Sequence, residues 1–276
     1  FSHVNLHFSR KPCAYMMARY NMRMNDTHSN SIDTATGESA PAALSSSRVK
    51  DIFARIANRY EAFNALSSFG AYRLWLAKMV KAADVGPADA VLDIAGGTGD
   101  VAFAVARAKR PAVVVCSDLV PEMLDVARAH AEAGAARGVP VHFHVVDAQD
   151  IPYDDDTFDV VTMAYGLRNM PRRERALSEI LRVLRPGGQL VCLDFSTPPS
   201  PLWNAMYGIY LRHVIPFWGK VVTGDASGFV YLSKSIRAFP DQQGVAAMMR
   251  EAGFEDIGWE DCTGGVACIH TARKPA

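Results

Sequence analysis

A glycine-rich segment follows an apolar run and carries the residue types that bind a nucleotide cofactor. The run Val91–Ile94 indicates a buried strand, and the sequence Ala95-Gly96-Gly97-Thr98-Gly99-Asp100 comes directly after it. Glycines allow a tight turn and a close approach of the backbone to a ligand. The next helix, which we expect to start near Thr98, presents free N–H groups there. We therefore predict cofactor contacts at Gly97 and Thr98, although a plain turn remains an alternative.

Two acidic positions at the ends of later strands suit a nucleoside. Asp118 ends the second predicted strand, where its carboxylate can accept both ribose hydroxyls. An N-cap for a helix beginning at Pro121 is the alternative. Asp147 and Ala148 end the third strand, where the carboxylate can meet an adenine amino group and the small alanine leaves room for the ring. A simple strand-end turn would explain Asp147 equally well.

The charges around the glycine segment favour S-adenosylmethionine (SAM) over a dinucleotide. Asp93 and Asp100 flank the segment. Two carboxylates are unfavourable beside a pyrophosphate but favourable beside a sulfonium and an α-amino group, and SAM carries both cations. Ala102 also stands where dinucleotide-binding loops prefer a third glycine, which discriminates only weakly. A nicotinamide-dependent oxidoreductase therefore stays a minor alternative.

The elements that must position these residues alternate between apolar runs and helical repeats, which is typical of an α/β fold. Residues 174–184 repeat leucine and isoleucine at helical spacing, and Arg185-Pro186-Gly187-Gly188 then ends that helix. Thr263-Gly264-Gly265 is short enough for a hairpin, so the last strand should be antiparallel. Continuous apolar runs are typical of strands buried on both faces of a parallel sheet. We predict a Rossmann-like, mostly parallel seven-stranded sheet with an antiparallel last strand and helices on both faces, with strands at 90–94, 112–117, 141–146, 158–163, 189–195, 254–262 and 266–272.

The chain before the sheet divides into a tail and a helical cap. Residues 1–47 lack periodic hydrophobicity, and Ser, Thr, Ala and Asp dominate 26–47, so we predict a disordered tail before a domain at 48–276. Two helices, near 49–60 and 72–79, should form the cap. The first 25 residues contain basic but no acidic side chains, and we favour upstream sequence or a mis-set start over a targeting signal.

Composition excludes several classes of protein. The chain has 29 basic and 29 acidic side chains, which gives no reason to expect nucleic-acid binding. Its longest apolar runs are strand-sized, and its 5 cysteines do not have zinc-ligand spacing, so we expect a cytoplasmic protein without a metal. His142 and His144 share one side of a predicted strand, where surface or hydrogen-bonded histidines are expected rather than ligands.

From Lys50 to Lys274 the chain resembles the ubiquinone/menaquinone biosynthesis C-methyltransferases, which are class I SAM-dependent methyltransferases. The shared motifs are Tyr60-Glu61-Ala62-Phe63-Asn64, the Leu92–Asp100 segment, Gly166-Leu167-Arg168-Asn169, Leu193-Asp194-Phe195-Ser196, Tyr231-Leu232 with Ser235-Ile236, and Phe239-Pro240-Asp241-Gln242. The resemblance implies SAM binding by Thr98, Asp118 and Asp147-Ala148. Bacterial members typically have Ser-Phe where this chain has Ala164-Tyr165. The family's serine is counted as a cofactor contact. The hydrogen bond that is lost with its hydroxyl is worth only about 0.5–1.5 kcal/mol, so alanine at this position need not abolish SAM binding.

The resemblance also implies C-methylation of a quinol ring, which needs a group that stabilises a phenolate or accepts its proton. Arg168 and Asn169 follow the fourth strand at the ligand-binding edge and are the catalytic candidates, with Tyr60 as a lid contact. The alternatives are an ion pair for Arg168, a helix N-cap for Asn169 and a core position for Tyr60.

We favour demethylmenaquinol as the substrate, with a polyprenyl-methoxy-benzoquinol or a catalytically idle SAM-binding scaffold as alternatives. The aromatic insert 202–222 is predicted to wall a pocket for the polyprenyl tail, or else to cover the core. Peripheral contact with the inner face of the membrane is a further alternative for this insert, since such aromatics suit membrane interfaces. A homodimer is also kept open.

Overall fold

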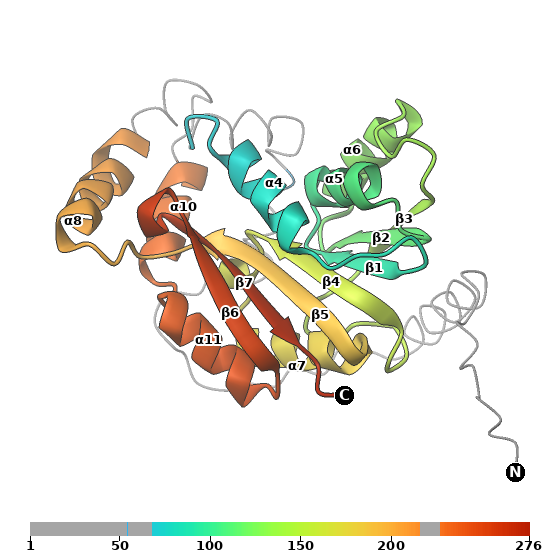
Figure 1. Cartoon of the computed structure of the whole chain (residues 1–276). Coiled ribbons are helices and arrows are strands. Elements are labelled where there is room, and N and C mark those ends of the chain that lie inside the picture. The colour runs from blue at the N-terminus through green and yellow to red at the C-terminus, as the bar shows by residue number, and fades with distance from the viewer. Residues whose placement is uncertain (1–53, 55–67, 216–226) are drawn as a thin grey trace, which may run out of the picture.

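The computed structural model describes Ala54, residues 68–215 and residues 227–276. Within these ranges the chain forms a single sheet with helices packed on both of its faces (Figure 1). The predicted tail 1–47 lies outside the described residues, as do the predicted helix 49–60 apart from Ala54 and the end of the insert from residue 216.

The sheet has seven strands in the order β3-β2-β1-β4-β5-β7-β6, which confirms the predicted fold class. The strands β1 to β5 pair in parallel, whereas β7 is antiparallel to both of its neighbours, β5 and β6. The predicted hairpin is a single 3-10 turn, η4, at Thr263–Gly265. The strands are β1 Ala90–Ile94, β2 Val113–Asp118, β3 Val141–Val145, β4 Phe158–Ala164, β5 Leu184–Phe195, β6 Glu255–Cys262 and β7 Ala267–Arg273.

Helices cover the two faces because successive residues of each buried strand point to opposite sides. Val91 and Val114 pack into one core with helices α4, α5 and α6, whereas Leu92 and Val115 pack into a second core with α7 and α11. Helix α10 joins the first core. The helices are α4 Tyr72–Ala82, α5 Asp100–Lys109, α6 Pro121–Glu132, α7 Arg173–Val183, α8 Pro201–Ile209, α10 Ser227–Arg237 and α11 Gln242–Glu251, with a short π-helix η3 at Tyr210–Val214.

The strand β5 begins earlier than the sequence predicts. It starts at Leu184, which pairs with Phe158, rather than at Gln189. The backbone of Gly187 and Gly188 exchanges hydrogen bonds with Lys274, so the Arg185–Gly188 segment continues the sheet instead of only ending a helix. The sequence pattern missed this because the partner of the glycines is a residue at the far end of the chain.

Candidate active site

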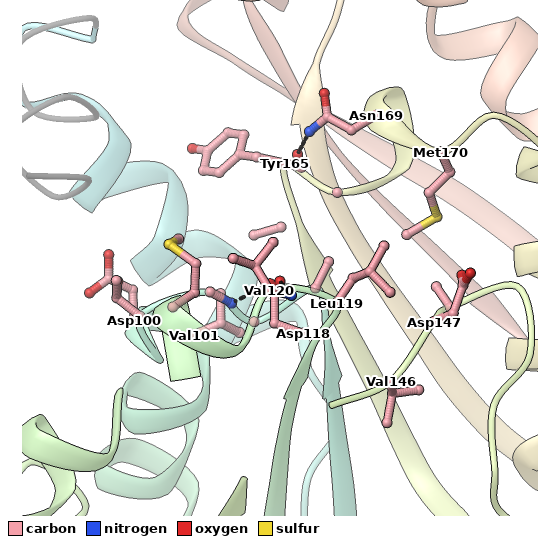
Figure 2. Close-up of a pocket in the computed structure, with 18 of the residues that line it drawn as sticks. Asp100, Val101, Asp118, Leu119, Val120, Val146, Asp147, Tyr165, Asn169 and Met170 are labelled. Atoms are coloured by element: carbon pink, nitrogen blue, oxygen red, sulfur yellow. Dashed lines mark hydrogen bonds between the residues drawn. The ribbon is translucent and has the colours of Figure 1, made fainter. Parts of the chain in front are cut away.

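A pocket opens at the carboxyl ends of β1, β2 and β4, where open α/β sheets bind ligands. Figure 2 shows Asp100, Asp118 and Asp147 on different sides of this pocket, with Asn169 over it. All five predicted cofactor contacts line the pocket, and so does Asn169. The lining residues from the strand ends and the segments that follow them are Ala95, Gly96, Gly97, Thr98, Asp100, Asp118, Leu119, Val120, Val146, Asp147, Ala148, Gln149, Ala164, Tyr165, Gly166, Asn169, Met170 and Pro171.

The glycine loop is shaped by what lies beneath it. The Gly96 N–H donates to the Ser117 carbonyl at 2.8 Å, and a side chain at Gly96 would begin 2.7 Å from Asp93 Oδ2, so only glycine fits there. Gly97 and Gly99 both have positive φ angles. Thr98 is 1% exposed, and its hydroxyl has no hydrogen-bond partner among the residues that the structure describes. A buried hydroxyl without a partner on a pocket wall fits a ligand that supplies the missing bond.

Asp118 connects the loop to the next strand. Its Oδ2 accepts from the Gly97 N–H and its Oδ1 accepts from the Val120 N–H, both at 2.9 Å. Burial raises the pKa of this carboxyl, although both hydrogen bonds favour the charged form. The N-cap alternative is wrong, because the N-cap of α6 is Val120 and no side chain caps it. A carboxylate has about four acceptor sites, so this one can still accept from a ribose hydroxyl.

Asp147 and Ala148 form the third side of the pocket. Asp147 Oδ1 accepts from the backbone N–H of Gln149 at 2.9 Å and from its side-chain amide at 3.1 Å. The strand-end turn considered above is therefore present, and the same turn carries Asp147 to the pocket wall. Gln149 also lines the pocket, and its position two residues after Asp147 was the only sequence signal for it.

The two aspartates that flank the loop do not both face the pocket, although the sequence analysis expected both carboxylates to lie beside the positive charges of SAM. Asp100 lines the pocket. Asp93 instead lies beneath the loop, where Oδ1 accepts from the Thr162 hydroxyl at 2.8 Å and Oδ2 from the Ala102 N–H at 3.1 Å. Complete burial raises the pKa of Asp93 to about 7. Asp93 therefore holds the loop together and is not one of the residues that line the pocket.

The end of β4 carries the catalytic candidates. Asn169 Nδ2 donates to the Tyr165 carbonyl at 3.0 Å, and its Oδ1 accepts from the Tyr231 hydroxyl at 2.9 Å. Arg168 forms an ion pair with Asp194 at 2.7 Å, in which both side chains are 5% exposed. Arg168 is not among the residues that line the pocket, so the structure contains the ion pair that was its alternative role. The N-cap alternative for Asn169 is wrong, because α7 is capped by Arg172.

A second, apolar cavity of about 290 Å³ lies beside the pocket. Its walls come from α4, α8, η3 and α10 together with Phe195 and Val266, and they include Phe69, Trp75, Trp203, Met206, Tyr207 and Tyr210. The rings of Tyr165, in the pocket, and Phe195, in the apolar cavity, are 5.2 Å apart between their centroids. Helix α4 also contributes to both spaces, so they are close neighbours.

Comparison with known proteins decides the family. Residues 42–274 match the ubiE/COQ5 methyltransferase family. The chain belongs to this family. A ubiquinone/menaquinone biosynthesis C-methyltransferase of Brucella anthropi is 41% identical over 82% of this chain and 87% of its own. The protein of the same name from Idiomarina loihiensis is 39% identical over 91% of this chain and 100% of its own.

Solved structures support the fold that the ubiE/COQ5 assignment implies. The Haemonchus contortus phosphoethanolamine N-methyltransferase 2, solved with S-adenosyl-L-methionine, superposes with a TM-score of 0.57. It is 17% identical and covers 81% of this chain and 60% of its own. At that identity the likeness concerns the fold alone.

The remaining predictions concern Tyr60, membrane-spanning helices, metal ions and the other residues of the pocket wall. Tyr60 lies outside the described residues. Among the described residues, no helix has the length and apolar character to cross a membrane, and no group of side chains is arranged to hold a metal ion. The sequence analysis missed Tyr72, Leu76 and Met123, which line the pocket from α4 and α6. Their apolar positions carry no sign that separates a pocket wall from a core.

Proposed function

We propose that this protein transfers a methyl group from SAM to a ring carbon of demethylmenaquinol. The carrying observation is that Thr98, Asp118 and Asp147 share one pocket with Asn169 in a chain of the ubiE/COQ5 family. The names of the relatives include both ubiquinone and menaquinone, so methylation of a polyprenyl-methoxy-benzoquinol is the second candidate.

The pocket has donors and acceptors for each part of SAM. The Asp118 carboxylate accepts from the ribose hydroxyls, and Asp147 and Ala148 hold the adenine. The partnerless Thr98 hydroxyl bonds to the cofactor, and the Asp100 carboxylate faces its positive charge. SAM supplies an activated methyl on a sulfonium, so the protein must align the ring carbon and exclude water.

Asn169 is the group on the pocket wall that acts on the ring. One of its two amide hydrogens bonds to the Tyr165 carbonyl, and the second remains for a ring oxygen of the quinol. A hydrogen bond to that oxygen strengthens as negative charge develops while the ring carbon attacks the methyl group. Arg168 contributes by holding the same carbonyl, since its Nη1 donates to Tyr165 at 2.5 Å.

The apolar cavity suits the polyprenyl tail. Its lining is nearly all apolar, and it lies directly beyond the Tyr165–Phe195 ring contact from the pocket. A ring at Asn169 thus has an apolar space beside it for an isoprenoid chain. Trp203→Ala should raise the KM for a long-tailed quinol more than that for a short-tailed one. Equal effects on both substrates would argue against this placement.

Turnover with purified substrates tests the reaction. We expect SAM and reduced demethylmenaquinone to give menaquinol, identified by mass spectrometry, with a lower kcat/KM for the benzoquinol. The reverse preference would assign the ubiquinone reaction instead. SAM binding without methyl transfer to either quinol would support the scaffold role and reject the proposal. Asp118→Asn, which impairs the nucleoside contact, is the negative control.

Helix α8 also offers a contact for a lipid surface, from which such a substrate would come. Leu202, Met206 and Ile209 are 74%, 53% and 61% exposed, and the exposed Arg212 and His213 follow them. Apolar side chains beside basic ones suit an anionic bilayer interface. Wild-type protein should float with anionic liposomes, and a Leu202→Ser/Ile209→Ser double variant should float less. No flotation of wild type would reject the contact.

A further inference from the structure

The hydroxyl of Tyr231 reaches from α10 to Asn169. It lies 2.9 Å from Asn169 Oδ1, and Asn169 lines the pocket. Tyr231 itself is not one of the residues that line the pocket. Its contact with the reaction site therefore runs through Asn169.

The orientation of the Asn169 amide follows from its two neighbours. A carbonyl oxygen only accepts, so the amide nitrogen must face the Tyr165 carbonyl, 3.0 Å away. The amide oxygen then faces Tyr231, whose hydroxyl must donate to it. The reverse orientation would place the amide oxygen against the Tyr165 carbonyl oxygen and would remove that bond, although the Tyr231 hydroxyl could still accept from the amide nitrogen.

The Tyr165 carbonyl is itself held in place. Arg168 Nη1 donates to it as well, so the two bonds fill both lone pairs of this oxygen. Asp194 fixes Arg168 twice, through the guanidinium at 2.7 Å and through the backbone N–H at 3.1 Å. Tyr165 has a φ of 57°, a left-handed conformation that costs free energy unless surrounding bonds impose it.

We propose that Tyr231 is a positioning residue that keeps the second amide hydrogen of Asn169 directed at the substrate oxygen. Without the Tyr231 hydroxyl, only the bond to the Tyr165 carbonyl holds the amide, so the amide plane can turn about the Cβ–Cγ bond and its second hydrogen is no longer held toward the substrate oxygen. The inference rests on the proposed function, in which Asn169 donates to the ring oxygen. Leu232 and Ile236 on the same helix line the apolar cavity, so α10 contributes to both ends of the substrate.

A double-mutant cycle tests the role. Tyr231→Phe should lower kcat about three- to tenfold with little change in the KM for SAM, because it removes one hydrogen bond outside the cofactor site. In an Asn169→Ala background the same change should have no further effect on kcat. The matched control is Ser235→Ala, which removes a hydroxyl on the same helix that donates to the Leu232 carbonyl at 3.0 Å, and this change should leave kcat unchanged.

Two kinetic results would overturn the proposal: an unchanged kcat in Tyr231→Phe, or an equal loss of kcat with and without Asn169. An NMR measurement that does not depend on turnover distinguishes failure of the positioning role from failure of the proposed function. In protein labelled with 15N-asparagine, Tyr231→Phe should shift the side-chain amide signal of Asn169, identified by its loss in Asn169→Asp, and should speed its exchange with solvent. If wild type methylates no quinol but this signal moves, the contact is real and the reaction assignment is wrong. If the signal stays in place, the positioning role is rejected.

Discussion

Replacement of Thr98 by valine should change stability and cofactor affinity in opposite directions. Thr98 is 1% exposed and its hydroxyl has no partner in the described part of the chain, so in the free protein it is a buried polar group without a hydrogen bond there. Valine has nearly the same shape and lacks that group. The variant therefore keeps the packing of the loop and loses only the bond that SAM is proposed to complete.

The magnitudes follow from the cost of an unmade hydrogen bond. Burial of a hydroxyl without a partner costs about 1–3 kcal/mol, so Thr98→Val should raise the free energy of unfolding of the SAM-free protein by about 1 kcal/mol. With SAM present the variant loses one hydrogen bond worth about 1 kcal/mol, and the Kd for SAM should rise about fivefold.

Urea unfolding without SAM and calorimetric titration with SAM measure the two effects. Thr162→Val is the matched control, because the Thr162 hydroxyl is equally buried but donates to Asp93 at 2.8 Å. It should destabilise the free protein by about 1–3 kcal/mol, which is the opposite sign. The reasoning is refuted if Thr98→Val destabilises the free protein and leaves the Kd for SAM unchanged.

Three further predictions concern the pocket and the glycine loop that forms part of its wall. Asp118→Asn should raise the Kd for SAM more than tenfold by titration, because the amide has one acceptor oxygen for the Gly97 N–H and the ribose; an unchanged Kd would contradict the ribose contact. Ala164→Ser adds a hydroxyl to the pocket wall and should lower that Kd by up to about tenfold, whereas weaker binding would place the cofactor elsewhere. Asp93 has a pKa of about 7 in the fold and about 4 in an unfolded chain, so the folded state binds its proton more tightly. The free energy of unfolding should therefore fall as pH rises from about 4 to about 7, and Asp93→Asn should flatten that fall; parallel pH profiles for the two proteins would contradict it.

Much of the fold could be predicted because burial on both faces leaves a simple pattern. Mostly continuous apolar runs marked β1 to β5, and glycines marked the hairpin between β6 and β7. The strand order and the early start of β5 could not be predicted from such local patterns. They depend on pairing between distant segments, such as Gly188 with Lys274, and no local pattern records that pairing.

The sequence predicted which strand ends carry the site residues, but it did not predict which groups their side chains contact. Asp93 and Asp100 looked equivalent in the sequence, yet the backbone turns Asp93 under the loop and leaves Asp100 on the pocket wall. Arg168 looked free to meet a substrate until the register of β4 with β5, which pairs Ala164 with Leu193, brought Asp194 beside it. The fate of a polar side chain at a strand end depends on its neighbour in space.

The pocket and the apolar cavity are built from different segments of the chain, and this affects how such an enzyme can diversify. Strand-end loops build most of the pocket, whereas α8, η3 and α10, inserted after β5, build much of the apolar cavity. Drift in that insert can change the size of hydrophobic group that fits while the proposed nucleotide contacts in the strand-end loops stay unchanged. Lineages with isoprenoids of different length would then diverge first in α8 and α10, and grafting this insert between relatives is a direct route to exchange their substrate range.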